Sequence, residues 1–215
     1  MSGRPPAEAT PRSGIRARQA EATRHAVLAA ASQLFASRGY TGTSIDAIAE
    51  TAGVSRSTVF TAAGGKPYLL KTVYDQAVVG DERPVPLAGR PESQKLRALG
   101  SGAEIVAAYA DILAPAVARV SALYDVVRTA ADTDEDVAAL WADIGRQRLE
   151  GARQIVALLT AAEALSPRLT PDRAADVITV YNDPGLHRHL VGDRDWTYEA
   201  FRDWLARALH HELLT

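Results

Sequence analysis

The segment that decides the fold is residues 43–66, TSIDAIAETAGVSRSTVFTAAGGK. Its first apolar residues recur at helical spacing on one face, at Ile45, Ile48, Ala49 and Ala52. Gly53 follows, and glycine can take the left-handed conformation that a tight turn between two helices needs. Ser55 is a natural N-cap for a second short helix. A small residue at Ala49, the glycine at the turn and an aliphatic anchor at Val59 together predict a helix-turn-helix.

Composition and charge narrow the class of protein. The chain has 215 residues, of which 47% are apolar and 23% are charged, as is usual for a globular protein with a real core. It contains no cysteine, which excludes disulfides, thiolate metal sites and cysteine catalysis. Residues 1–71 have nine basic and four acidic side chains, a net charge of +5, which leaves −7 for the rest of a chain whose total is −2. A basic N-terminal part on an acidic body favours a polyanionic partner for the first part alone.

The apolar run AVLAAA at residues 26–31 follows several arginines and superficially resembles a signal peptide. Ser32 and Gln33 interrupt this run, and its apolar residues follow helical periodicity, so we expect no secretion and a cytoplasmic location. We also expect no membrane partner, because no segment approaches the roughly 18 apolar residues that a membrane span requires.

Apolar periodicity predicts helices throughout the chain. We expect residues 1–15 to be a disordered basic tail, or alternatively a basic arm whose Arg12, Arg16 and Arg18 touch phosphates or enter a minor groove. The predicted domains are a helix-turn-helix domain over 16–66, a connecting helix over 67–80, and a helical body over 81–215. Further helices are expected over 18–37, 92–99, 103–130, 134–162 and 171–180, and from residue 197 onward.

The N-terminal third resembles the DNA-binding domain of the tetracycline-repressor (TetR) family. The residues that carry the resemblance are GYTGTS at 39–44, IAETAGVSRSTVF at 48–60, Lys66, and the pair Leu69-Leu70. Beyond about residue 80 the similarity is one of architecture only. The resemblance implies an all-α fold, in which an N-terminal three-helix helix-turn-helix DNA-binding domain precedes an α-helical regulatory and dimerisation domain. It also implies a homodimer that binds a double-stranded DNA operator and is released by a small-molecule effector.

By position in the family's motif, eight residues are expected at DNA. Thr43 and Ser44 would hydrogen-bond a phosphate, and Lys66 would contact another phosphate at the start of the following helix. Ser55, Arg56, Ser57 and Thr58 would face the major groove, where Arg56 is suited either to a guanine edge or to a phosphate. Phe60 stands where the family usually has tyrosine. Thr61, Ala62 and Ala63 replace a stretch that is usually aromatic, so some other side chain should fill the space at Ala63.

The body offers candidates for two further sites. The effector-pocket candidates are Tyr109, Leu113, Tyr124, Arg128, Trp141 and Arg148, with plain core packing as the alternative for the aromatic residues. Arg148 lies on an apolar face and needs a partner. It could pair internally with an acid such as Asp125, which we favour, or anchor an anionic effector. The dimer-interface candidates are Val177, Tyr181, Phe201, Trp204, Leu205 and Leu209, with packing inside one chain as the alternative.

Catalytic and metal chemistry have little support in the sequence. There is no nucleophile elbow, phosphate-binding glycine loop or metal motif, and His187 and His189 have no third ligand at a recognised spacing. We therefore predict no catalytic residue, metal or cofactor. The predicted function is a sequence-specific transcriptional regulator, a repressor released from a palindromic operator by an effector. The alternatives are an effector-independent or architectural DNA-binding protein and a helical enzyme.

Overall fold

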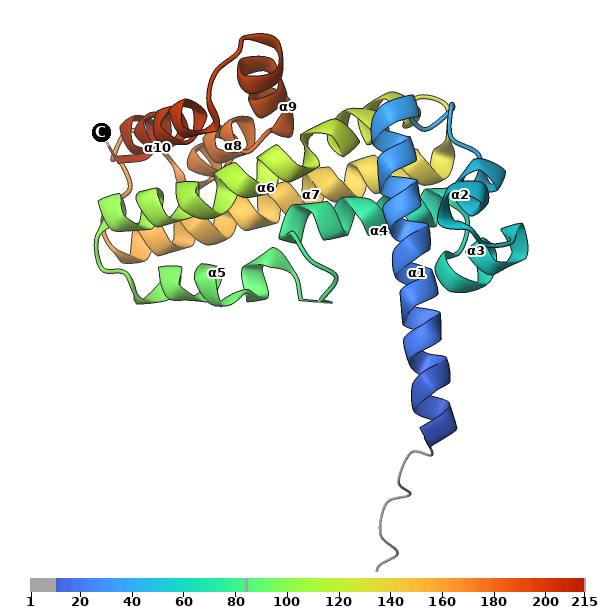
Figure 1. Cartoon of the computed structure of the whole chain (residues 1–215). Coiled ribbons are helices and arrows are strands. Elements are labelled where there is room, and N and C mark those ends of the chain that lie inside the picture. The colour runs from blue at the N-terminus through green and yellow to red at the C-terminus, as the bar shows by residue number, and fades with distance from the viewer. Residues whose placement is uncertain (1–10, 84, 215) are drawn as a thin grey trace, which may run out of the picture. The chain divides into compact units, whose positions relative to one another are not determined.

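The computed structural model describes residues 11–83 and 85–214, and every regular element in them is a helix (Figure 1). The predicted all-α fold is therefore confirmed. The chain divides into two compact units, Met1–Val73 and Tyr74–Thr215. The boundary between them falls inside α4, within the predicted connecting helix.

The first unit contains a long helix and three shorter segments. Its elements are α1 (Pro11–Arg38), α2 (Ile45–Ala52), α3 (Arg56–Ala63) and the first half of α4 (Lys66–Val79). Helices α2 and α3 pack against the second half of α1 and against each other. Their shared core consists of fully buried side chains, among them Val27, Phe35, Ile48, Val59, Leu69 and Leu70.

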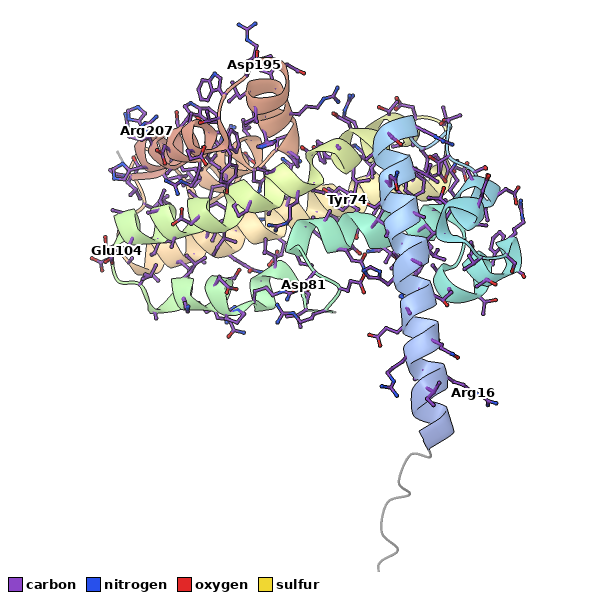
Figure 2. The ribbon with its side chains drawn as sticks, in the orientation of Figure 1. Arg16, Tyr74, Asp81, Glu104, Asp195 and Arg207 are labelled. Atoms are coloured by element: carbon purple, nitrogen blue, oxygen red, sulfur yellow. The ribbon has the colours of Figure 1, made fainter. Side chains whose placement is uncertain are left out.

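Helix α1 begins earlier than expected, at Pro11 and not near Arg18. Proline is tolerated in the first turn of a helix because its missing N–H has no intrahelical partner there. Residues 11–15 of the predicted tail are therefore helical, and residues 1–10 lie outside the described part of the chain. The exposed N-terminal turns of α1, which carry Arg16, extend away from α2 and α3 (Figure 2).

The turn between α2 and α3 has the geometry that its sequence predicts. Gly53 has φ of 67°, in the left-handed region. Its N–H donates to the Glu50 carbonyl, and the Val54 N–H donates to the Ala49 carbonyl at 3.0 Å, which satisfies the carbonyls at the end of α2. The chain then re-enters a helix at Ser55, the N-cap of α3. The turn thus fixes the direction in which α3 leaves α2.

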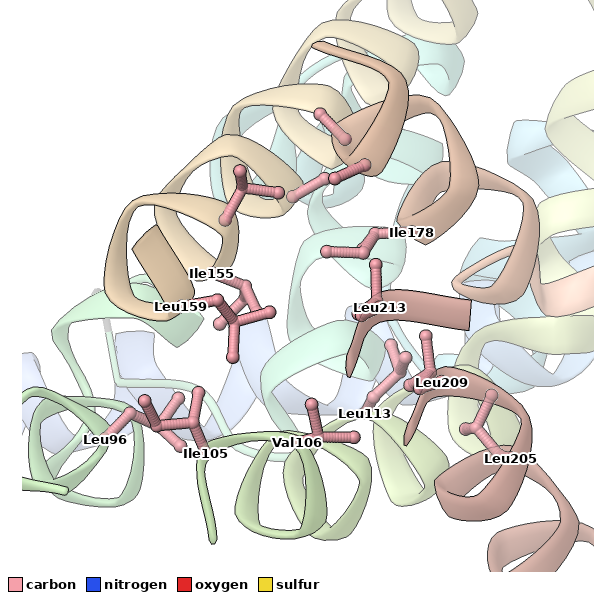
Figure 3. Close-up of a cluster of buried hydrophobic side chains, with 14 of the residues drawn as sticks. Leu96, Ile105, Val106, Leu113, Ile155, Leu159, Ile178, Leu205, Leu209 and Leu213 are labelled. Carbon is pink, nitrogen blue, oxygen red and sulfur yellow. The ribbon is translucent and has the colours of Figure 1, made fainter. Parts of the chain in front are cut away.

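The second unit is a helical bundle built around α6 and α7. After the end of α4 its elements are η1 (Leu87–Gly89), α5 (Pro91–Lys95), η2 (Leu96–Ala98), α6 (Gly102–Ala130), α7 (Glu135–Ala161), α8 (Pro171–Tyr181), α9 (Pro184–His187), η3 (Arg188–Asp193) and α10 (Tyr198–Leu214). Helix α8 packs on α7, and α10 packs on α6. Between these helices lies one apolar core, in which Ile105, Leu159, Ile178 and Leu205 meet (Figure 3).

Helix α6 is apolar enough to need comment. By length and composition alone it could cross a membrane, because a window of it has a mean hydropathy of 1.5, contrary to what we expected of every segment. One side of α6 is packed along its length in the core, from Ile105 through Val117 to Val127. A central core helix has this composition for that reason, and Pro115 does not divide it.

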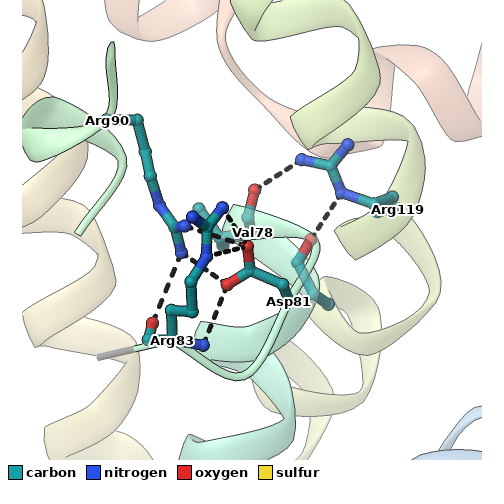
Figure 4. Close-up of polar contacts among 6 residues, drawn as sticks. Val78, Asp81, Arg83, Arg90 and Arg119 are labelled. Carbon is teal, nitrogen blue, oxygen red and sulfur yellow. Dashed lines mark hydrogen bonds and ion pairs between the residues drawn. The ribbon is translucent and has the colours of Figure 1, made fainter. Parts of the chain in front are cut away.

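Polar contacts join the end of α4 to the rest of the second unit (Figure 4). Arg119 of α6 donates hydrogen bonds to the carbonyls of Ala77 and Val78, in the last turn of α4. Beyond that turn the buried Arg90 forms a bidentate pair with Asp81, with Nη1 2.9 Å from Oδ2 and Nη2 2.7 Å from Oδ1. These contacts fix the C-terminal end of α4 against the second unit.

Candidate functional site

The N-terminal end of α3 presents short hydroxyl side chains. Ser55 caps the helix, since its Oγ accepts a hydrogen bond from the Thr58 backbone N–H at 3.1 Å. The same oxygen lies 2.9 Å from Ser57 Oγ and 2.7 Å from Thr58 Oγ1. Ser55 and Ser57 are exposed, and Thr58 is half-buried. Because each hydroxyl can both donate and accept, this cluster keeps capacity for a ligand while its members orient one another.

Arg56 is the first residue of α3 and the long cation of its first turn. Its Nη1 donates to Oδ2 of Asp46, on α2, at 2.6 Å. The guanidinium carbon also lies 5.7 Å from the centroid of the Phe60 ring, one turn further along α3. The two paired side chains are 59% and 67% exposed, so the pair adds little to stability. It does determine where the guanidinium stands before any ligand arrives.

The two residues at the start of α2 have different roles. Ser44 is exposed and is the N-cap of α2, where its Oγ accepts from the Ala47 N–H at 3.1 Å. Thr43 is only 1% exposed, and its hydroxyl donates to the Gly39 carbonyl at 2.8 Å. The expected phosphate contact from Thr43 is therefore wrong, because its hydroxyl is buried and already donating. The expected contact from Ser44 stays a prediction.

Lys66 begins α4 and is half-buried. Its Nζ lies 4.0 Å from the centroid of the Tyr40 ring, a cation–π contact that restricts where the ammonium group can point. At the end of α3, the Phe60 ring remains 47% exposed. Lys66 and Phe60 are thus both placed where they can be tested as DNA contacts.

The stretch that departs from the family's pattern is organised by two residues that the sequence analysis missed. Arg24 of α1 donates to the Ala62 carbonyl at 2.8 Å and so closes the last turn of α3. Tyr68 of α4 lies over Gly64, where a Cβ would come within 3.1 Å of its ring. Gly64 also has φ of 71°, so a larger residue would be strained there. An arginine 38 positions away has no local sequence signal that could have identified it.

In the second unit, Arg148 of α7 sits at the centre of a polar network. Its hydrogen-bond acceptors are Asn182 Oδ1 at 2.9 Å, the Tyr124 hydroxyl at 2.9 Å, the Thr179 carbonyl at 2.6 Å and Asp183 Oδ2 at 3.4 Å. The internal role that we favoured for Arg148 fits these contacts, since four protein acceptors satisfy most of its donors. The suggested partner Asp125 is wrong. Asp125 instead pairs with Arg188 and Arg128.

Two tyrosines complete this network. Burial raises the pKa of Tyr124 to about 12, and its hydroxyl donates to Asp183 Oδ2 at 2.9 Å. Burial likewise raises the pKa of Tyr109 to about 12, against the opposing effect of a hydrogen bond with Asn182. Both hydroxyls therefore stay protonated at neutral pH and act as hydrogen-bonding groups.

A cavity of about 640 Å³, open to solvent, lies beside Arg148. It is lined by Gly145, Arg148, Leu149, Asp176, Thr179, Val180, Asp183, Gly185 and Leu186. Of the six predicted effector residues, only Arg148 lines this cavity. Leu113 and Tyr124 are buried, Tyr109 packs against the core, Trp141 packs on Tyr124 with ring centroids 4.9 Å apart, and Arg128 is exposed. The alternative of plain packing thus describes the aromatic residues better than a pocket lining does.

The predicted dimer-interface residues separate into two groups. Phe201, Leu205 and Leu209 are fully buried within the second unit, against α6, so the expectation that they form an interface is wrong for these three. Val177, Tyr181 and Trp204 are half-buried. The Tyr181 and Trp204 rings lie 6.0 Å apart, and Val180, beside them on α8, is 62% exposed.

No cluster of three or more His, Asp or Glu side chains that could hold a metal ion occurs in residues 11–83 and 85–214. His189 contacts Asp193 at 3.6 Å, while His187 packs edge-on against Phe201. Burial lowers the pKa of His187. The histidine pair in the sequence is thus divided between a surface contact and a packing contact.

Comparison with known proteins agrees with this description. Residues 27–73 match the family described as bacterial regulatory proteins, tetR family. No curated protein matches the chain in sequence. Three similar solved structures come from different bacteria.

NalD from Pseudomonas aeruginosa, described as the secondary repressor of the MexAB-OprM multidrug efflux pump, has a TM-score of 0.67 at 20% identity, covering 91% of this chain and 98% of its own. FadR from Bacillus subtilis, solved with stearoyl-CoA, has a TM-score of 0.67 at 14% identity over 87% and 98% of the two chains. A protein from Saccharomonospora viridis, solved with choline, has a TM-score of 0.68 at 18% identity over 89% and 97%.

At these identities the solved structures show the fold, while the match over residues 27–73 covers most of the first unit. The predicted resemblance to the TetR family is confirmed. The chain is therefore a transcriptional regulator of the tetR family, with its helix-turn-helix in residues 27–73 and a helical body of the same fold behind it.

Proposed function

We propose that this protein is a homodimeric repressor that binds a palindromic operator through α3 and leaves it when a small molecule binds the body. The observation that carries the proposal is the preorganised N-terminal end of α3. There Ser55, Arg56 and Ser57 are exposed on a helix-turn-helix whose other face is packed on α1. Short hydroxyls and an arginine at the start of a recognition helix suit base edges and phosphates in a major groove.

The dimer follows from the reading geometry. One α3 reads a few base pairs, and a two-fold pair of such helices reads two half-sites about one helical turn apart or multiples of it. The exposed Val180 and the half-buried Val177, Tyr181 and Trp204 form a patch on α8 and α10 that suits an isologous interface. We propose this patch, without the buried residues of α10, as the contact between protomers.

Effector binding is supported by the open cavity beside Arg148 and by relatives of the same fold that were solved with stearoyl-CoA and with choline. The acids Asp176 and Asp183 line this cavity together with Leu149 and Leu186. Since Arg148 is already satisfied by protein acceptors, the lining favours a ligand with a cationic group and an apolar part over an anion. The effector must bind the DNA-free geometry more tightly than the DNA-bound one.

The test begins with selection of bound duplexes from a random DNA pool, followed by titration of the enriched duplex with the wild-type protein and with Arg56→Ala. We expect a palindrome to be enriched, and we expect Arg56→Ala to weaken binding most at one base position of each half-site. An absence of any enriched sequence would refute the proposal of sequence-specific regulation. Release of the protein from that duplex by members of a metabolite library, cationic amphiphiles included, separates the effector-controlled repressor from an effector-independent DNA-binding protein.

A further inference from the structure

Asp46 is an unexpected residue on a DNA-reading surface. It lies in the first turn of α2, and its side chain is 67% exposed. A carboxylate beside a phosphate backbone opposes binding, because it adds negative charge where a polyanion must approach. The carboxylate is nonetheless 2.6 Å from the guanidinium of Arg56, the long cation at the start of α3.

We propose that Asp46 is a specificity-determining residue that holds the Arg56 guanidinium in place for a base edge and withholds it from backbone phosphate. The inference rests on the proposed function, in which α3 enters the major groove. It assigns to Asp46 a positioning role that acts through Arg56.

The geometry of the guanidinium supports this role. Among the described residues, its one hydrogen bond runs from Nη1 to Asp46, and its carbon lies 5.7 Å from the Phe60 ring centroid. A carboxylate and an aromatic ring thus both restrain a side chain that would otherwise sample many rotamers. The donors on Nη2 and Nε remain available for a bidentate contact, the geometry by which arginine recognises guanine.

Charge gives a second reason. An arginine that pairs with a carboxylate carries no net attraction for phosphates at a distance, so it contributes little to non-specific binding. The same guanidinium without Asp46 would be a mobile cation beside the DNA and would gain a phosphate contact on any sequence. Removal of Asp46 should therefore strengthen binding to random DNA while it weakens discrimination between sequences.

Glu50 provides a matched control on the same helix. It is an exposed acid one turn beyond Asp46, and the hydrogen bonds and ion pairs described for residues 11–83 give its carboxylate no basic partner. Asp46→Ala and Glu50→Ala remove the same charge from α2, but only the first frees Arg56. Asp46→Glu restores the carboxylate with one more methylene.

The experiment measures affinity for three duplexes over a range of salt concentrations. The duplexes are the one enriched from a random pool, the same duplex with the Arg56-dependent base pair changed, and a random-sequence duplex. We expect Asp46→Ala to lower the ratio of affinities for the first two duplexes about tenfold, within the range that a bidentate base contact provides. We also expect it to steepen the salt dependence by about 0.9 for each phosphate gained. Glu50→Ala should change the ratio less than about twofold, and Asp46→Glu should recover most of it.

A double variant separates the possible causes. If Asp46 acts through Arg56, Asp46→Ala in an Arg56→Ala background leaves the affinity ratio unchanged. An equal fall of the ratio in both backgrounds, or equal effects of Asp46→Ala and Glu50→Ala, would overturn the inference while leaving the DNA-reading role of α3 intact. If Arg56→Ala itself has no effect on binding, the proposed role of α3 fails and the inference fails with it. Circular dichroism spectra and thermal unfolding of each variant show whether α2 remains folded.

Discussion

The Arg119 guanidinium of α6 donates a hydrogen bond to the Val78 carbonyl, 2.8 Å away, in the last turn of α4. A second hydrogen bond runs from Nε to the Ala77 carbonyl at 2.9 Å. Carbonyls at the end of a helix have no intrahelical partner, and a cation there also interacts favourably with the helix dipole. Since α4 crosses the boundary between the two units, its C-terminal end is where the helical body holds the connecting helix.

We expect Arg119→Ala to destabilise this end of α4 by about 1 kcal/mol, because the carbonyls would pass to water. Hydrogen exchange of the amides of residues 76–80 should speed up, while exchange in α7 should stay unchanged. Arg153→Ala, which removes an exposed arginine of α7, is the control. Equal exchange rates at α4 in both variants would show that the contact from Arg119 does not fix the helix end.

The Asp81 carboxylate predicts a dependence of stability on pH. The hydrogen bond from Arg90, followed by that from Arg83, lowers the pKa of Asp81 below its ordinary value of 3.8. A carboxylate whose pKa is depressed in the folded state contributes stability above the pKa of the unfolded chain and loses it as the pH falls towards the folded value. We therefore expect the wild type to be more stable than Asp81→Asn at neutral pH.

The difference between these two proteins should shrink as the pH falls below about 4. Urea unfolding at a series of pH values measures it. Asp132→Asn, at an exposed acid with no ion pair among the described residues, should show no such trend. A difference between wild type and Asp81→Asn that stays constant down to low pH would contradict the assignment of the pair with Arg90.

How far the sequence predicted the molecule depended on how local each feature is. The turn at Gly53 and the cap at Ser55 are set by neighbouring residues, and both were predicted. The choice between Thr43 and Ser44 as the cap of α2 turns on a single residue's backbone, and the buried Thr43 was misassigned to DNA. A change of one position thus decided whether a hydroxyl faces solvent.

Features that depend on distant residues were predicted less well. The apolar stripe of α10 has the same periodicity whether it faces α6 or another protomer, so Leu205 could not be placed from the sequence. Arg148 clearly needed a partner, but Asn182 and Asp183 lie more than thirty residues away, whereas Asp125 seemed available on the preceding helix. Periodicity identifies a face that will be covered, and only the tertiary arrangement identifies what covers it.

Arg148 should prove to be a structural residue of the body. Arg148→Ala would leave the buried Asn182 amide and the Thr179 carbonyl without their donor, at a cost of about 3 kcal/mol in the free energy of unfolding. Arg146→Ala, two residues away on α7, removes an exposed arginine paired with Asp143 and should cost less than about 1 kcal/mol. Chemical unfolding of both variants decides the matter. Similar small losses would instead leave Arg148 free to serve a ligand.

Lys66 is predicted to contact phosphate and not bases. Its half-buried side chain is held over Tyr40, so Lys66→Ala should weaken binding to the enriched duplex and to random DNA by a similar factor. The slope of log affinity against log salt should fall by about 0.9, one phosphate contact for each protomer. Lys95→Ala, an exposed lysine in α5, is the control. A loss confined to one base position would contradict the phosphate assignment.

The separation of the α8 and α10 residues into buried and exposed groups gives opposite predictions for two substitutions. Leu209→Ala removes a fully buried side chain and should destabilise each protomer by about 2–5 kcal/mol without lowering the association constant of the folded protein. Val180→Glu places a charge on a 62% exposed position and should leave the protomer folded. If the patch around Val180 is the contact between protomers, this buried charge should shift the protein to monomers in analytical ultracentrifugation.

Ala157→Glu adds the same charge to an exposed position of α7 and controls for charge alone. Loss of the dimer should also abolish cooperative binding to a two-half-site operator while weak binding to a single half-site survives, because each protomer keeps its own α3. A protein that stays dimeric with glutamate at position 180 would place the interface elsewhere on the body. A wild type that is monomeric at the concentrations used for DNA binding would remove the need for an interface at all.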